Sequence, residues 1–240
     1  DFNIVGEAWY PRGSASAWWQ KDSKMNESNS NLKTVMDFDL TFTCQKAFGD
    51  VCSSNEGSEA GLFKIYEVIA QDFMFPDPNN VLIFLDNHDL GRFMQKGESD
   101  LRRYKQAIAF LLTTRGIPQI YYGTEILMSG TKAEGDGVIR SDFPGGWVGD
   151  PKDAFTPEGR TDLQNEAWNY MRKLLNWRQR CDAVKEGKLI HYTPDGSGCY
   201  VYARVKDNKT VLVLMNGTDQ NQTLDMNRFN EVVKDHKSGK

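Results

Sequence analysis

Short apolar segments alternate with segments of helical periodicity along most of this sequence, and this alternation constrains the fold more than any other feature. Each apolar segment is suited to a buried parallel strand. The four expected strands are residues 2–9, 34–40, 81–86 and 117–122. The expected helices are residues 41–48, 59–75, 100–115 and 165–179. Strand and helix segments in this order predict an α/β architecture with a parallel sheet.

The pattern changes after residue 187. Three short alternating segments, at 188–192, 199–205 and 210–216, are separated by the turn sequences PDGSG and KDNK, which is typical of antiparallel strands. We therefore expect an α/β domain at residues 1–187 and the start of an all-β domain at residues 188–240. A complete eightfold (β/α) barrel takes roughly 250 residues. If the first domain is a barrel, half of it is absent.

Composition and charge exclude several classes of protein. The 240 residues carry 29 Lys and Arg against 33 Asp and Glu, a net charge of −4, which provides no basic surface for nucleic acid. No apolar run approaches the roughly 18 residues that a membrane span needs. The four cysteines have no CxxC spacing and the three histidines are scattered, so we expect no metal site. The chain starts without Met inside an expected strand, which suggests a fragment of a longer protein.

Polar residues end two of the apolar strands, where active sites of parallel α/β folds are built. Glu7 ends the first, and Asp86, Asn87, His88 and Asp89 end the third. Apolar neighbours that include Trp9 predict a partly desolvated Glu7 with a raised pKa, as a general acid needs. A second carboxylate beside Asn and His would stay ionised, which is the glycosidase arrangement. The alternative, of equal weight, is that Glu7 and Asp89 cap helices or bridge strands.

Three sequence motifs resemble those of one enzyme family. GEAW at residues 6–9, FLDNHD at 84–89 and RGIPQIYYGTE at 115–125 resemble the strand-5, strand-7 and strand-8 motifs of the α-amylase superfamily of glycoside hydrolases, in the family's order. The IRSDFPGGW stretch favours neopullulanase or cyclomaltodextrinase-like members. The resemblance implies the C-terminal half (strands 5–8) of a TIM (β/α)8 barrel, followed by a truncated antiparallel β-sandwich domain.

The resemblance also implies roles for individual residues. Glu7 would be the acid/base, and Asp89 would stabilise the transition state. The substrate-binding residues would be His88, Asn87, Arg92, Trp9, Tyr10, Asp136, Arg140 and Trp147. Asn87 would fix the loop geometry, Arg92 would pair with a catalytic carboxylate, and the D-x-x-x-R pair of Asp136 and Arg140 would contact sugar beyond the cleavage point.

Several of these residues have a plain alternative: His88 as a satisfied core histidine, Arg92 as a solvated side chain and Trp9 and Tyr10 as core packing. For Asp136 and Arg140 the alternative is a solvated, glycine-rich loop.

The family's nucleophile is an Asp in a G-x-R-x-D motif on the strand before GEAW, and this sequence has no such motif there. Arg140-Ser141-Asp142 is a partial match, but it follows the last barrel strand and is rejected. We therefore expect a retaining α-1,4-glucosidase parent and a chain that is inactive alone. The alternative is a non-catalytic carbohydrate-binding or scaffold relative of the amylase barrel.

The resemblance limits the expected ligands and partners. The substrate would be an α-glucan or maltooligosaccharide, with starch, pullulan and cyclodextrin left open and hydrolysis not separated from transglycosylation. No cofactor is evident, although the resemblance allows Ca²⁺ in the full-length parent. Half a barrel would need the missing N-terminal half or a second copy of the chain as a partner. Neither nucleic acid nor a membrane is expected.

Overall fold

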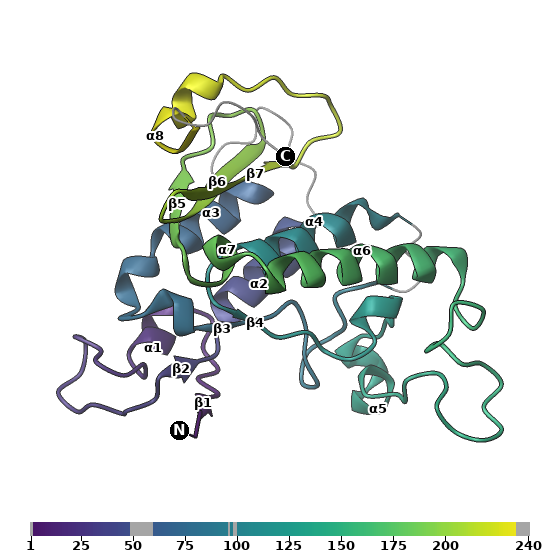
Figure 1. The fold of residues 1–240 in the computed structure, drawn as a ribbon. Helices are drawn as coiled ribbons and strands as arrows, with labels where there is room; N and C mark the ends of the chain where they lie inside the picture. The colour runs from purple at the N-terminus through teal and green to yellow at the C-terminus, as the bar shows by residue number, and fades with distance from the viewer. Residues whose placement is uncertain (1, 49–59, 96, 98–99, 234–240) are drawn as a thin grey trace.

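The computed structural model of the chain describes residues 2–48, 60–95, 97 and 100–233. Figure 1 shows an α/β part followed by a small antiparallel sheet. In these described ranges, no helix is long and apolar enough to cross a membrane. The helices are α1 (Gly13–Ala17), α2 (Phe38–Ala47), α3 (Leu62–Ala70), α4 (Leu101–Thr113), α5 (Asp136–Ile139), α6 (Asp162–Gln179), α7 (Asp182–Glu186) and α8 (Asn230–Val233). The strands are β1 (Val5–Gly6), β2 (Thr34–Val35), β3 (Leu82–Ile83), β4 (Ile117–Pro118), β5 (Lys188–Tyr192), β6 (Cys199–Lys206) and β7 (Lys209–Asn216).

The first four strands are parallel and lie in the order in which they occur in the chain. β1 pairs with β2, and β3 pairs with β4. A single bridge between Met36 and Leu82 links the two pairs. The Asp37 amide supports this bridge by donating to the Leu82 carbonyl oxygen at 2.9 Å. The predicted α/β architecture with parallel strands is confirmed.

α2 begins three residues earlier than the sequence pattern predicts. Asp37 accepts a hydrogen bond from the Leu40 amide at 3.0 Å and caps the helix. The second strand therefore ends at Val35, and the expected strand over 34–40 is wrong in its last five residues. The Asp37 side chain provides a hydrogen-bond acceptor for a free amide in the first turn of the helix. If the strand continued to residue 40, this amide would have no such partner nearby in the sequence.

Side chains of α2 also replace strand pairing beyond the end of β3. Thr41 Oγ1 donates to the Phe84 carbonyl oxygen at 2.8 Å, and Gln45 Nε2 donates to the Leu85 carbonyl oxygen at 3.1 Å. Buried backbone carbonyls need such partners, and here a helix provides them. The backbone leading into residue 86 is thereby held from one side.

β1 is more exposed than the buried strand expected over residues 2–9. Only Val5 and Gly6 are in the strand, while Phe2 is 92% and Trp9 43% exposed. Within the described residues, β2 lies at one edge of β1 and no strand lies at the other. An apolar strand with an open edge is available to pair with another segment.

The longest helices agree with the predictions. α4 matches the expected helix over 100–115, and α6 begins three residues before the expected helix over 165–179 because Thr161 and Gln164 form a capping box. These two helices run alongside each other (Figure 1) and contribute to the largest apolar core. α3 covers only the middle of the expected helix over 59–75. Residue 59 lies outside the described part. The long segment between β4 and α6, for which the sequence pattern predicts no helix, contains the short helix α5.

The last part of the chain forms the three antiparallel strands predicted for it. β6 lies between β5 and β7. Tyr202 of β6 faces the α/β part, where its hydroxyl lies 2.5 Å from Thr113 Oγ1 of α4. Phe229 and Val232 pack against the other face of β6, so α8, not a second sheet, covers that face in the described residues. Residues 234–240 of the expected all-β region lie outside the described part.

A buried arginine joins three elements of the α/β part. Arg115, 1% exposed, lies just before β4. Its guanidinium donates to both carboxylate oxygens of Asp72 at 2.5–2.9 Å and lies 2.9 Å from Asp37 Oδ2. Burial raises the pKa of Asp72, and Arg115 partly offsets that rise. Two carboxylates from different elements are thus held by one buried cation.

We expect Arg115→Leu to lower the free energy of unfolding by about 3–5 kcal/mol, because it leaves two buried carboxylates without a cation. Urea unfolding followed by circular dichroism measures this. Arg102→Leu is the control, because its ion pair with Asp100 is exposed, with side chains 76% and 51% accessible, and its loss should leave the stability almost unchanged. Equal losses in the two variants would contradict the assignment.

Candidate active site

The turn after β3 presents two polar side chains. Asn87 is buried, and its Oδ1 accepts hydrogen bonds from the amides of Asp89 and Leu90 at 2.9 and 3.0 Å. This local Asx turn reverses the chain directly after the strand. The side chains of His88 and Asp89 are left 59% and 28% exposed. Asn87 therefore fixes the loop geometry, and the alternative of a core histidine at position 88 is wrong for this structure.

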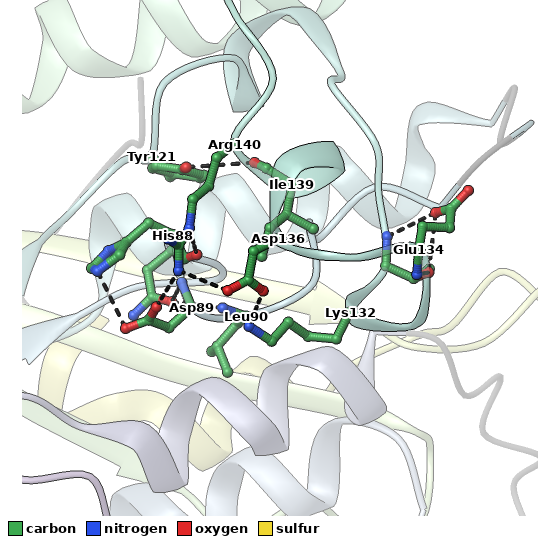
Figure 2. Close-up of polar contacts among 11 residues, drawn as sticks. His88, Asp89, Leu90, Tyr121, Lys132, Glu134, Asp136, Ile139 and Arg140 are labelled. Carbon is green, nitrogen blue, oxygen red and sulfur yellow. Dashed lines mark hydrogen bonds and ion pairs between the residues drawn. The ribbon is translucent and has the colours of Figure 1, made fainter.

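Four predicted site residues meet at this turn (Figure 2). Arg140 Nη2 lies 2.7 Å from Asp89 Oδ1 and 3.1 Å from Asp136 Oδ2, and its Nε donates to the His88 carbonyl oxygen at 2.8 Å. His88 Nε2 lies 3.2 Å from the other oxygen of Asp89. The predicted D-x-x-x-R pair of Asp136 and Arg140 thus converges on Asp89 from α5, about 50 residues along the chain.

Lys132 extends this group of ion-paired side chains beyond Asp136. It pairs with Asp136 one helical turn away, and this hydrogen bond, before any other effect, lowers the pKa of Asp136. The charges therefore alternate in sign from Lys132 through Asp136 and Arg140 to Asp89. Such an arrangement orients Asp89 while its side chain remains 28% exposed.

Asp86 lies beneath this turn and was not among the predicted site residues. It is 2% exposed; its Oδ2 accepts from the Phe93 amide at 2.8 Å and its Oδ1 from Thr124 Oγ1 at 3.2 Å. Burial raises the pKa of Asp86 to about 6, against the effect of the Phe93 hydrogen bond. Asp86 therefore links the loops that follow β3 and β4.

Arg92 has a different role from either one predicted for it. It is 6% exposed, so it is not a solvated side chain. Its Nε donates to the Ile139 carbonyl oxygen at 2.9 Å, it also donates to the Tyr122 carbonyl oxygen, and its guanidinium lies 4.0 Å from the Tyr121 ring centre. Within the described contacts it forms no ion pair with Glu7 or Asp89. The expectation of such a pair is wrong, because Arg92 fastens α5 to the loop after β4.

Glu7 lies at the end of β1, in a more open environment than predicted. Its side chain is exposed, and the expected desolvation by neighbouring strands is absent because only β2 lies beside β1 among the described residues. Trp9 stacks on Phe38 with ring centres 4.5 Å apart and planes 16° apart. Phe38 in turn packs edge-on against Phe84, 5.1 Å away. An aromatic chain therefore connects the segment of Glu7 to the strand that leads to Asp89.

Trp147 and Tyr10 share no described hydrogen bond, ion pair or ring contact with the Asp89 cluster. Trp147 is 81% exposed, and its backbone exchanges hydrogen bonds with Asp150. Tyr10 is 39% exposed. The polar contacts of the structure thus bring together His88, Asp89, Asp136 and Arg140, and among the described residues none of these contacts involves Trp147 or Tyr10. Among the described residues, no group of three or more His, Cys, Asp and Glu side chains could hold a metal ion.

Known proteins are similar to this chain in both sequence and fold. A cyclomaltodextrin glucanotransferase from Thermoanaerobacterium thermosulfurigenes is 31% identical over 79% of this chain and 23% of its own length. An alpha-amylase from Niallia circulans is 30% identical over 79% of this chain and 31% of its own. The crystal structure of the Geobacillus thermoleovorans alpha-amylase with acarbose superposes with a TM-score of 0.69 at 25% identity, covering 92% of this chain and 43% of that one.

The three motifs, the parallel strand order and these likenesses place the chain in the α-amylase superfamily of carbohydrate-active enzymes. Within it, residues 189–240 match the cyclo-malto-dextrinase C-terminal domain family. The chain spans less than half the length of the relatives described above.

We expect the stability of the chain to report the titration of Asp86. Its pKa is about 6 in the folded protein and about 3.9 when unfolded, so the folded state binds the proton more tightly. Stability should fall by roughly 3 kcal/mol from this group as pH rises from about 3 to about 7, and stay lower above it. Asp86→Asn should lose that component. Urea unfolding of both proteins at several pH values measures the difference.

Asp136→Asn is the control of opposite sign. Its pKa is lowered in the folded state, so the wild-type carboxylate contributes stability above its unfolded pKa and loses it as pH falls. A wild-type-minus-variant difference at position 86 that does not change with pH would overturn the assignment of the buried carboxyl.

Proposed function

We propose that this chain contributes the acid/base side of a retaining α-1,4-glucosidic cleavage site, with Glu7 as the acid/base and Asp89 as the stabilising carboxylate. The observation that carries the proposal is Asp89, held on one oxygen by Arg140 at 2.7 Å and on the other by His88 at 3.2 Å. It lies after a parallel strand, where such folds place catalytic groups. Relatives named alpha-amylase and cyclomaltodextrin glucanotransferase support the substrate class.

The proposed reaction uses the two carboxylates differently. Glu7 donates its proton to the glycosidic oxygen as the bond breaks, then removes a proton from the incoming water or sugar hydroxyl. The Asp89 carboxylate accepts hydrogen bonds from sugar hydroxyls and favours the positively charged transition state. His88 donates to the sugar from the exposed side of the turn, while Asp136 and Arg140 contact rings farther from the bond cleaved.

The nucleophile of this mechanism lies outside the 240 residues. A retaining glycosidase needs a second carboxyl about 5–5.5 Å from the acid/base, and no G-x-R-x-D motif precedes Glu7. In the proposed architecture β1 to β4 are strands 5–8 of an eightfold barrel, and residues 188–240 begin its C-terminal β-domain. The chain alone would then bind sugar without completing turnover.

The open edge of β1 leads to a prediction about assembly. Phe2, Ile4 and Val5 are 92%, 56% and 41% exposed on a segment with a strand at one edge only in the described region. Pairing of that edge would bury apolar surface and satisfy backbone groups. We expect the 240-residue chain to self-associate, with a mass above 27.3 kDa by light scattering. A stable monomer at all concentrations would contradict the half-barrel architecture.

We expect Glu7→Gln in the full-length protein to reduce cleavage of maltooligosaccharides by several orders of magnitude, within the roughly 10²–10⁴-fold range of general acid catalysis. Part of the activity should return on an aryl glycoside with a good leaving group, because that group needs little protonation. Reducing-sugar and chromogenic assays measure the two effects.

Glu158→Gln provides the matched control, because Glu158 is an exposed carboxylate in the loop before α6. Near-normal turnover by Glu7→Gln would overturn the acid/base assignment. Sugar binding without turnover by the wild-type full-length protein would instead favour the non-catalytic relative.

A further inference from the structure

A group of partly exposed aromatic side chains lies just beyond the segment of Glu7. Tyr10, Trp18 and Trp19 are 39%, 38% and 38% exposed. With Ser14 and Ala15 they line a shallow hollow of about 440 Å³ on the surface of α1. The two indole rings have centres 4.5 Å apart and planes at 76°. Adjacent tryptophans left this exposed are costly unless they serve a binding role.

The local sequence explains the shape of the hollow. In Gly-Ser-Ala-Ser-Ala-Trp-Trp, the small residues Ser14 and Ala15 lie one turn before Trp18 and Trp19 and therefore on the same side. The Trp18 amide donates to the Ser14 carbonyl oxygen at 3.2 Å, which continues the helical turn to the first indole. Small side chains thus form the floor and large rings the wall.

The opposite side of the same segment is anchored in the core. Ser16, Ala17 and Gln20 are at most 1% exposed. Gln20 Nε2 donates to the Asp77 carbonyl oxygen at 2.8 Å, and its Oε1 accepts from the Asp77 amide at 3.0 Å. Ser16 Oγ donates to the Ala8 carbonyl oxygen at 3.3 Å, next to Glu7. The aromatic rings are therefore presented on a held backbone, which lowers the entropy lost on binding.

We propose that Tyr10, Trp18 and Trp19 form a second glucan-binding site, an aromatic platform that stacks on the sugar rings of an α-1,4-linked chain outside the Asp89 cluster. The ligand class rests on the proposed function. Glucose rings present apolar C–H faces and hydroxyl edges, which match exposed rings flanked by the Tyr10 and Ser14 hydroxyls. The five lining residues carry no charge, as suits a neutral ligand, and Tyr10 connects the platform to the Glu7 segment.

The test measures binding of maltoheptaose by calorimetry and retardation of the 240-residue chain in native gels that contain amylopectin. Trp18→Ala and Trp19→Ala should each weaken binding roughly three- to tenfold, and the double variant should be retarded less than either single variant. Maltoheptaose should also quench indole fluorescence more strongly in the wild type than in the double variant, which keeps four other tryptophans. Phe73→Ala is the matched control, because that ring is 84% exposed and lies outside the platform, so it should bind normally.

Ser14→Glu keeps both indoles, and it serves if the tryptophan variants do not fold by circular dichroism. The added charge on the floor of the hollow should weaken the retardation as the double variant does. Retardation and affinity that are unchanged in the double variant, or no wild-type binding at all, would overturn the platform. A double variant that changes the oligomeric mass but not glucan binding would identify an assembly surface and also overturn it.

A separate arm distinguishes this proposal from the proposed function. Glu7→Gln should leave retardation and quenching unchanged, because Glu7 does not line the hollow. If Glu7→Gln retains full turnover in the full-length protein while the platform variants lose glucan binding, the acid/base assignment fails and the platform stands. If Glu7→Gln loses turnover and the platform variants bind normally, the reverse holds.

Discussion

The α/β part of this chain depends on one buried cation. Arg115 lies before β4 and holds Asp37, which caps α2 after β2, and Asp72, which follows α3. The parallel strands are only two residues long, so their ladder hydrogen bonds are too few to fix the relative positions of these elements. The ion pairs of Arg115 with both carboxylates tie these elements together, because removing the guanidinium would leave the two carboxylates without their shared partner.

A second buried arginine joins the C-terminal sheet to the same region. Arg204 of β6 is fully buried and donates to the carbonyl oxygens of Thr113, Thr114 and Gly187. Burial lowers its pKa to about 10, so it is still charged at neutral pH, and carbonyl dipoles solvate it in place of a carboxylate. The sheet is therefore docked by polar contacts as well as by the apolar packing of its tyrosines, and it stabilises the helix that leads to β4.

Sequence patterns predicted the parts of the structure that depend on local order. Long amphipathic segments predicted α4 and α6. The family resemblance singled out Asp136 and Arg140 as sugar contacts, and their ion pair with each other follows from the helix α5, in which residues four apart face one side. Patterns did not predict which polar residues are buried. From the sequence, Arg92 and Asp86 are expected to be exposed or to belong to the site. Their burial depends on loops that meet only after folding. The cap at Asp37 was missed because a β-like run continued through it.

The two halves of the proposed site differ in how completely the chain itself forms them. Around Asp89 each supporting group belongs to the chain: the Asn87 turn, Arg140, and Asp86 and Arg92 beneath them, so the carboxylate is oriented before any sugar arrives. Around Glu7 the aromatic packing of Trp9 on Phe38 holds the backbone, but the carboxyl itself remains exposed. An acid/base needs partial desolvation to carry a proton near neutral pH. Another strand or a bound substrate at the open side of β1 would remove water from Glu7. That step would complete the proposed catalytic site.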